Sequence, residues 1–554
     1  MKVSTSSSPC VVCQRYGFGR RQLRAYAFEQ ALEERQRTGP FPSSRCRWIG
    51  SFWIFRPSFN LLSVSDAEVF ARGVRARERP LLFPTVEYGI FFLLVFALAW
   101  SLRRQMRAHK VLLLVASYAF YAFWDWRFLP LLIGISLLAV AVGRALQLES
   151  NARARKALLA AGVALALTTL IAFKYLGFFA STAFNLLELL GRNPSAIRLP
   201  EIILPVGISF FVFHAISLMV DAFRGQIPVS VNALDGLLYV AFFPQLIAGP
   251  ILRAHSFLPQ LAAPPNPDAI DAAAALELIA IGLVKKVLIA TVIAGRLVDP
   301  VFDSFGERST VEAVLAIYGY AAQIYCDFSG YTDIAMGSAL LLGYRMPANF
   351  NAPYLATSPR DFWHRWHISL SSWLRDYLFI PLGGSRRGPR RTSANLGLTM
   401  LLGGLWHGAA WTFVLWGGFH ALGLVVHRWW AASSGAFPRL LRTTAHWKWI
   451  SRLLTFHFVC AGWVFFRAPS TDAIWELLKA LGRWRGVAPM SAVVLLALAV
   501  GLLTQICPPI VRARLRCRFS ELPLVLQGLA FATALLLIEA LGPQGVAPFI
   551  YFQF

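Results

Sequence analysis

One histidine stands inside a long apolar stretch, in the decapeptide GGLWHGAAWT at 403–412. An ionisable side chain within a membrane span costs about 3 kcal/mol or more, so it usually faces a bundle interior or a watery cavity. Imidazole also suits proton transfer near neutral pH. Gly403, Gly404 and Gly408 leave room beside the His407 ring for a substrate. We interpret His407 as a candidate general base; the alternative is a neutral histidine satisfied by a backbone carbonyl or a hydroxyl.

A second candidate, His367, lies in the polar and basic segment 345–391, between apolar stretches. Read as a helix from Pro359, this segment has two faces. The apolar face comprises Phe362, Trp366, Leu370, Trp373, Leu374, Tyr377 and Leu378, and the polar face Arg365, Ser372, Arg375 and Asp376. Such a helix suits the plane of a membrane interface. His367 falls at the border between the faces, which suits a side chain at a cavity mouth; the alternative is an interfacial histidine without chemistry.

His364 and His367 are spaced as neighbours on a helix and could hold a metal ion. No further His, Cys or carboxylate pattern of zinc spacing accompanies them, so we predict no metal site. The composition does not decide between two roles for the basic residues of this segment. One role is contact with lipid headgroups, and the other is docking of an anionic acyl donor. These residues are Arg360, Arg365, Arg375, Arg386, Arg387, Arg390 and Arg391.

The composition indicates a polytopic membrane protein. Of 554 residues 57% are hydrophobic and only 15% charged, with a mean hydropathy of +0.55. The net charge of +25 is explained by basic cytoplasmic loops, and no nucleic-acid-binding motif is present. Cys10 and Cys13 have CxxC spacing without a second pair, which we interpret as chance.

The elements that must position the histidines are apolar helices. We predict an all-α polytopic membrane protein with roughly 11–13 transmembrane helices, plus re-entrant and interfacial amphipathic helices. Segment 234–253 is apolar but broken by Pro244 and Pro250, and we predict that it is re-entrant. The candidate spans are 86–102, 110–124, 127–146, 157–180, 202–222, 275–294, 311–326, 329–343, 394–410, 411–430, 450–466, 489–507 and 522–541.

Basic loops predict the orientation. The loops after the first span, before the fourth span and at 385–391 belong in the cytoplasm under the positive-inside rule. The first 80 residues are then on the outside, although they are polar, Arg-rich and lack a secretory signal. We therefore divide the chain into an N-terminal extension, 1–80, interpreted as a misassigned translation start, and a functional domain, 81–554. Mass spectrometry of the mature N-terminus tests this division: a peptide from 25–35 would contradict it.

The run from Tyr325 to about Trp430 resembles the membrane-bound O-acyltransferase family, in particular its bacterial polysaccharide branch, that of alginate O-acetyltransferase. The matching motifs keep the family order and cover nearly all of 81–554. They are LPVGISFFVFHAIS (204–217), FFPQLIAGPILR (242–253), GLVKKVLIA (282–290), YCDFSGYTDIAMG (325–337), NFNAPY (349–354), FWHRWHISLSSWLRDYLFIPLGG (362–384), GGLWHGAAWTFVLWGGFHA (403–421) and PFIYFQF (548–554).

The resemblance implies transfer of an acyl group from a thioester to a hydroxyl. It implies that His407 matches the family's catalytic histidine and His367 its second histidine, both on the walls of a tunnel through the membrane. The remaining motif residues, Asn349, Trp366, Arg375, Asp376 and Trp406, are expected to line the site. Two positions depart from this branch: His214 stands where Gln is frequent, and Thr291 where Asp is common, which leaves the acceptor open.

The resemblance also implies the setting of the reaction. The acyl group, expected to be acetyl, comes from acetyl-CoA or an acylated carrier protein in the cytoplasm, with no bound cofactor. It is delivered across the bacterial inner membrane, usually with an extracytoplasmic O-acetyltransferase partner, to a polysaccharide such as alginate. Membrane lipids are the other expected contacts. Two other classes remain: a transporter or flippase, which the broken segment 234–253 would also suit, and a scaffold for a separate acyltransferase.

Overall fold

The computed structural model describes residues 82–192, 202–247, 249–304, 308–433, 444–483, 490–507, 509–543 and 549–550. These residues form helices and connecting loops, with no β-strand among them. The predicted extension 1–80 and its cysteines lie outside the described residues. The chain is an all-α membrane protein, as predicted.

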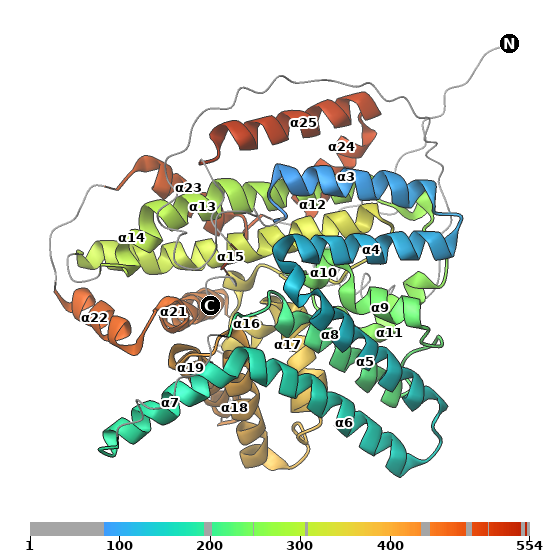
Figure 1. The fold of residues 1–554 in the computed structure, drawn as a ribbon. Coiled ribbons are helices and arrows are strands. Elements are labelled where there is room, and N and C mark those ends of the chain that lie inside the picture. The colour runs from blue at the N-terminus through green and yellow to red at the C-terminus, as the bar shows by residue number, and fades with distance from the viewer. Residues whose placement is uncertain are drawn as a thin grey trace.

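The first half of the described chain consists of paired apolar helices. α3 packs on α4, α12 packs on α15, and α5, α6 and α8 form a neighbouring group (Figure 1). The Tyr88 hydroxyl of α3 donates to the Ser338 hydroxyl of α15 at 2.9 Å. The bounds are α3 Val86–Ser101, α4 Met106–Asp125, α5 Leu129–Leu148, α6 Ala152–Leu170, the π-helical turn η2 Ile171–Tyr175, α7 Leu176–Leu189, α8 Ile208–Phe223, α9 Ala233–Ala241, α10 Phe243–Leu246, α11 Ala254–Phe257, α12 Ala272–Leu283, the π-helical turn η5 Val284–Ala290, α13 Thr291–Ile293 and α14 Asp299–Phe302.

The second half places two short helices, α16 and α17, at the centre of Figure 1, between the longer ones. α18 and α19 pack against each other, and α19 packs against α21. The bounds are α15 Thr310–Leu341, α16 Pro359–Arg365, α17 Ile368–Leu374, the π-helical turn η9 Arg375–Phe379, α18 Gly388–His407, α19 Trp411–Ser433, α21 Ala445–Arg467, α22 Thr471–Gly482, α23 Ala492–Leu503, α24 Pro509–Glu521 and α25 Leu524–Leu541.

The two predicted spans 311–326 and 329–343 are one helix, α15. A capping box starts it, since the Ser309 hydroxyl accepts from the Glu312 N–H and the Glu312 carboxylate accepts from the Ser309 N–H. Its polar middle does not break it, because ion pairs with the preceding segment satisfy the carboxylates. Asp327 pairs with Lys286, and Asp333 lies 2.7 Å from Lys285.

The prediction of a broken apolar segment at 234–253 is confirmed. Helix α9 ends at Ala241, the chain turns at Phe242, and α10 follows for four residues. Phe242, Phe243 and Leu246 are fully buried. The irregular backbone is therefore covered by protein, as it must be at membrane depth.

The amphipathic helix predicted from Pro359 to Leu378 is divided into α16, α17 and η9. The break comes at Trp366, which has an extended backbone, and His367, which is left-handed. The prediction that His364 and His367 share one helix is therefore wrong: His364 lies on α16 and is exposed, whereas His367 precedes α17 and is fully buried. The apolar face packs on protein: the Trp373 ring stacks on Phe213 of α8, with centroids 3.7 Å apart.

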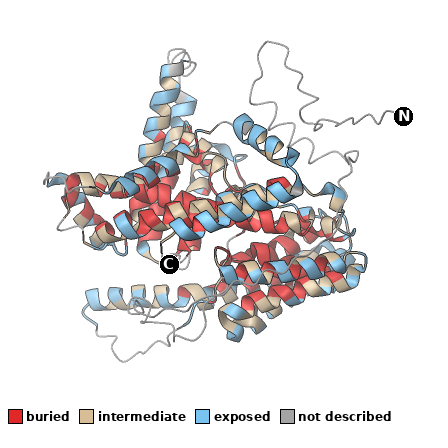
Figure 2. Cartoon of the chain, turned by 90° about the horizontal axis from the view of Figure 1, so that it is seen from above, coloured by how far each residue is buried: buried red, intermediate tan, exposed pale blue. Residues whose placement is uncertain are grey.

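The outer faces of the helices are apolar. Among the described residues, four helical stretches are long and apolar enough to cross a membrane: 106–148, 152–189, 272–302 and 446–467. Shorter apolar helices accompany them, at 86–101, 208–223, 492–503 and 525–541. Figure 2 shows exposed residues along the outward faces of the helices and buried residues on the inside. Exposed leucines such as Leu94 on α3 and Leu536 on α25 suit contact with lipid.

Two glycines allow α18 and α19 to approach closely. A Cβ added to Gly404 would lie 3.2 Å from the Cα of Gly417 and closer still to the carbonyl oxygen of Phe413. A Cβ on Gly417 would in turn lie 2.5 Å from the carbonyl oxygen of Met400. Small residues at such crossings are how membrane helices pack. The approach fixes the end of α18, on which His407 stands.

Gly404→Ala is therefore expected to destabilise the protein by about 1–3 kcal/mol, because backbone atoms cannot yield to the new methyl group. The matched control is Gly397→Ala on the same helix, where a Cβ meets nothing within 4 Å; it is expected to melt at the wild-type temperature or slightly above. Thermal melting of the two purified variants measures the difference. Equal melting temperatures would contradict this packing.

Candidate active site

His407 is the last residue of α18 and is 4% exposed. Aromatic rings surround its imidazole at right angles or nearly so. The ring centroids of Trp406 and Trp416 lie 5.0 Å from that of His407, and Phe466 lies at 5.2 Å. The next residue, Gly408, has an extended backbone, so the helix stops at the histidine. The arrangement holds an imidazole at a helix end inside an apolar wall.

His367 adopts a strained backbone conformation at the break between α16 and α17. Its φ is 43° and its ψ 53°, in the left-handed region that residues other than glycine rarely occupy. Its ring is fully buried and meets the edge of Phe328 at 4.6 Å between centroids. Such a conformation persists only where the surroundings hold it. The surroundings here are the contacts of Asn349.

The side-chain oxygen of Asn349 accepts three hydrogen bonds. The donors are the backbone N–H of Ser369 at 3.1 Å, the hydroxyl of Ser369 at 2.8 Å and Nδ1 of His367 at 3.2 Å. Because the backbone N–H can only donate, the amide orientation is fixed and Nδ1 of His367 must carry a proton. In the neutral ring, Nε2 then carries the lone pair. Within the described residues, Nε2 makes no hydrogen bond, so it is available to a substrate donor.

Asn349→Ala would leave the Ser369 donors and Nδ1 of His367 without their acceptor. Each buried donor that loses its partner costs about 1–3 kcal/mol. We expect a lower melting temperature together with a loss of acyl transfer, because the proton of His367 is no longer fixed on Nδ1 and its left-handed backbone is no longer held in place. Differential scanning fluorimetry and a transfer assay on the same preparation measure both. Wild-type values in both would show that Asn349 does not hold His367.

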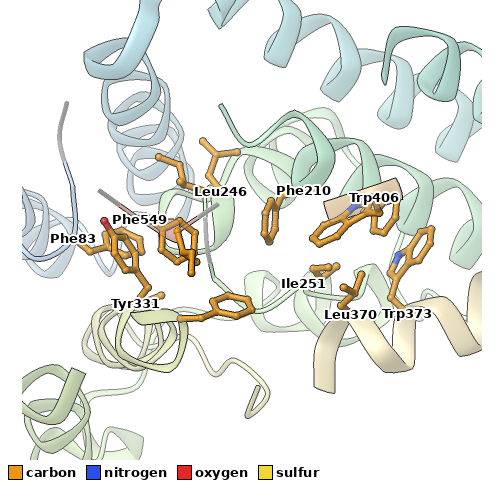
Figure 3. Close-up of a cluster of buried hydrophobic side chains, with 14 of the residues drawn as sticks. Phe83, Phe210, Leu246, Ile251, Tyr331, Leu370, Trp373, Trp406 and Phe549 are labelled. Carbon is orange, nitrogen blue, oxygen red and sulfur yellow. The ribbon is translucent and has the colours of Figure 1, made fainter. Parts of the chain in front are cut away.

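Trp406 joins the two imidazoles. Its ring contacts His407 at 5.0 Å and His367 at 6.0 Å between centroids. On its other side it packs on Phe210 and Phe213 of α8. Figure 3 shows Trp406 beside Phe210, with Trp373 and Leu370 nearby. The structure therefore brings together four of the predicted site residues: His407, His367, Asn349 and Trp406.

The other three predicted residues take different places. Trp366 directly precedes His367 and is buried in a wall of rings, 4.9 Å from Trp463 and 5.1 Å from Phe350 between centroids. Trp463 contacts Phe466, which contacts the His407 ring, so two rings separate Trp366 from His407. Arg375 and Asp376 lie in η9, away from the histidines. Asp376 lines an opening of about 370 Å³, here termed the basic opening, and Arg375 is bound to its carboxylate. The lining residues are Arg224, Gln226, Arg253, His255, Asp376, Tyr377 and Ile380.

Asp376 binds two arginines at the basic opening. Arg253 lies 2.9 Å and Arg375 2.7 Å from its carboxylate. Burial raises the pKa of Asp376, but the hydrogen bond from Arg375 and the charges of Arg253 and Arg375 outweigh it, so this pKa lies below its ordinary value. Asp376 is thus ionised and holds two guanidinium groups at the rim.

Sequence reasoning missed Lys174 and Tyr175 of η2. Lys174 reaches the backbone of Trp406 and His407, and Tyr175 that of Leu405. The signal was present, because a lysine within the apolar span 157–180 is an ionisable group at membrane depth. The aromatic wall residues Trp416 and Phe466 carried no comparable signal. Within the described ranges no three His, Cys, Asp or Glu side chains gather as metal ligands would.

Comparison with known proteins places this site in a family. Residues 168–464 match the model described as "MBOAT, membrane-bound O-acyltransferase family". The protein named "Probable alginate O-acetylase AlgI" of Pseudomonas aeruginosa is 39% identical over 410 residues, covering 73% of this chain and 76% of the relative. The "Peptidoglycan O-acetyltransferase" of Helicobacter pylori is 37% identical over 406 residues, covering 68% and 75%.

A more distant relative is the "Teichoic acid D-alanyltransferase" of Bacillus subtilis, 30% identical over 271 residues, covering 47% of this chain and 68% of the relative. The family match covers both histidines, Asn349, and Lys174 and Tyr175 of η2. The chain therefore belongs to the membrane-bound O-acyltransferase family and is an O-acyltransferase.

Proposed function

We propose that the protein moves an acetyl group from a cytoplasmic thioester through the membrane for O-acetylation of an extracytoplasmic polysaccharide, with His407 as the general base. The observation that carries this proposal is a line of ring contacts from the basic opening to the histidines, here termed the aromatic row. It runs from Tyr377 to Trp373 at 5.0 Å, to Phe213 at 3.7 Å, to Trp406 at 5.5 Å and to His407 at 5.0 Å between centroids.

The basic opening lies on the predicted cytoplasmic side. Arg155, beside the basic loop that precedes α6, donates to the carbonyl of Phe223 at 2.7 Å. The next residue, Arg224, donates to the carbonyl of Asp376 at 2.9 Å. The positive-inside rule assigns that loop to the cytoplasm. Guanidinium groups there suit a phosphate-bearing donor, which is either acetyl-CoA or an acylated carrier protein.

His407 supports general base catalysis by its position. Its imidazole takes the proton of an acceptor hydroxyl, whose oxygen bonds to the thioester carbonyl carbon. The carbon–sulfur bond then breaks, and the departing thiolate recovers the proton from the imidazolium. Such a base contributes about 10²–10⁴-fold in rate, and the remainder comes from holding two substrates in line.

The tautomer of His367 narrows its role. Polarising the thioester carbonyl would need a proton on Nε2, whereas Asn349 holds the proton on Nδ1. Nε2 is therefore an acceptor, suited to a hydroxyl or amide N–H of a substrate. We assign His367 to orienting a substrate rather than to polarising its carbonyl.

The named relatives act on alginate and on peptidoglycan, and we propose an acceptor of the same polymer class. Because a soluble polymer stays outside the bilayer, we expect an extracytoplasmic O-acetyltransferase partner to complete the transfer. The expected location is the bacterial inner membrane.

Sealed vesicles of known orientation test the direction of transfer. Radiolabelled acetyl-CoA, or carrier protein charged with labelled acetate, is supplied outside inverted vesicles, whose outer surface is the cytoplasmic face. We expect label on polysaccharide in the lumen, protected from external polysaccharide lyase. Labelling only in right-side-out vesicles, with the donor outside, would contradict the proposed direction.

A further inference from the structure

The turn η2 places a lysine inside a membrane-spanning stretch. It interrupts the helical stretch 152–189 with π-helical geometry, and Lys174 and Tyr175 are its last two residues. Single π turns within helices frequently occur at functional sites. An ionisable residue at membrane depth is costly, so its contacts indicate what it does.

Lys174 and Tyr175, here termed the polar clamp, bind the end of α18. Nζ of Lys174 lies 2.5 Å from the carbonyl oxygen of Trp406 and 3.2 Å from that of His407. It also lies 3.4 Å from the hydroxyl of Ser209. An ammonium has three N–H donors, and three oxygens face it. The Tyr175 hydroxyl donates to the carbonyl of Leu405 at 2.8 Å.

These carbonyls need partners because of how α18 ends. The last four carbonyls of any helix lack intrahelical donors, and the extended backbone of Gly408 ends α18 abruptly. Ser209 lies roughly 21 Å along α8 from Phe223, at 1.5 Å per residue, and Phe223 is at the level of the cytoplasmic loop. The helix end thus lies within a hydrocarbon core of ~30 Å, without bulk water. A lysine also complements the negative end of the helix dipole.

We propose that the polar clamp positions the catalytic imidazole: by fixing the last turn of α18, Lys174 and Tyr175 hold His407 against Trp416 and Phe466. This inference rests on the proposed role of His407 as base. The hydrogen bonds of both clamp residues to the end of α18 go to the backbone carbonyls of residues 405–407. Nζ of Lys174 also lies 5.9 Å from the centroid of the Trp406 ring, which touches both histidines. Loosening the clamp is therefore expected to displace the ring.

The test measures kcat and KM of purified protein with the donor that the wild type uses, acetyl-CoA or acetylated carrier protein. Lys174→Met keeps the chain length and removes the donors. We expect kcat to fall about 10- to 100-fold, the loss that a misplacement of about 1 Å causes, with KM for the donor unchanged. Lys174→Arg, which keeps N–H donors, is expected to recover part of kcat. Lys156→Met, an exposed lysine on α6, is the matched control and is expected to keep the wild-type kcat.

Tyr175→Phe tests the polar clamp if the Lys174→Met protein does not accumulate in membranes. It deletes one hydroxyl and is expected to lower kcat about 3- to 10-fold at unchanged KM, in keeping with the loss of one hydrogen bond. A wild-type kcat in Tyr175→Phe overturns the clamp, as does a loss confined to KM.

A double-mutant cycle separates the clamp from the proposed base. If the clamp acts through His407, each clamp variant combined with His407→Ala is no slower than His407→Ala alone. Losses that multiply overturn the positioning role. If His407→Ala alone keeps wild-type kcat, the proposed base fails instead, whatever the clamp variants do.

Discussion

His407→Ala is expected to lower polymer O-acetylation about 10²–10⁴-fold, the range that a general base contributes. The imidazole stands at the end of α18 within an aromatic wall, and the Trp406 ring contacts both it and His367. O-acetyl groups released by mild alkali from the polymer of cells carrying each variant provide the measurement, normalised to the abundance of the protein in membranes.

This variant also separates the other classes of function. A scaffold for a separate acyltransferase would keep O-acetylation when one buried imidazole is removed. A transporter would lose O-acetylation but would retain cleavage of the donor thioester by another enzyme. His420→Ala is the control for loss of a buried ring: His420 is fully buried on α19, and its two ring nitrogens make no hydrogen bond within the described residues. We expect it to lower stability while retaining transfer per folded molecule.

His367→Ala carries the second large effect, a fall in transfer of roughly 10- to 100-fold from lost substrate orientation. The hydrogen bond from Nδ1 to Asn349 leaves the lone pair of the neutral ring on Nε2, which makes no hydrogen bond within the described residues. Initial rates at several donor and acceptor concentrations are the measurement. A rise in KM for one substrate, alongside the fall in kcat, identifies the substrate that Nε2 holds.

The neighbouring histidine gives a matched control. His364 lies three residues earlier, on α16, and is exposed, whereas His367 is fully buried. His364→Ala is expected to transfer acyl groups at the wild-type rate. Equal losses in the two variants would indicate a general effect on the segment, and would contradict a specific role for His367.

The apolar helices, and His407 as a candidate site residue, were predictable from the sequence, because hydropathy sets the spans and an intramembrane histidine is conspicuous. The boundaries of α3 and α25 differ from prediction by one or two residues only. The single helix α15 was not predictable, since its polar middle resembles a break until Asp327 meets Lys286, 41 residues earlier.

Contacts distant in sequence explain the other differences. The pattern of apolar residues from Phe362 to Leu378 is helical throughout, but the chain breaks at His367, where Asn349 binds both Nδ1 of His367 and the backbone N–H of Ile368. Lys174 lies 233 residues before His407, and no local pattern connects the two.

The central claim is that His407 removes the proton from the acceptor hydroxyl. Its most direct test is the initial rate of label transfer from a thioester donor to a soluble oligosaccharide acceptor in the presence of the extracytoplasmic partner. Purified wild-type protein and purified His407→Ala are compared at a temperature at which both are folded. The account predicts a rate in His407→Ala lower by about 10²–10⁴-fold, with the donor bound as in the wild type. A rate within about threefold of the wild type would contradict it, because so small a change corresponds to less than about 0.7 kcal/mol in the activation barrier.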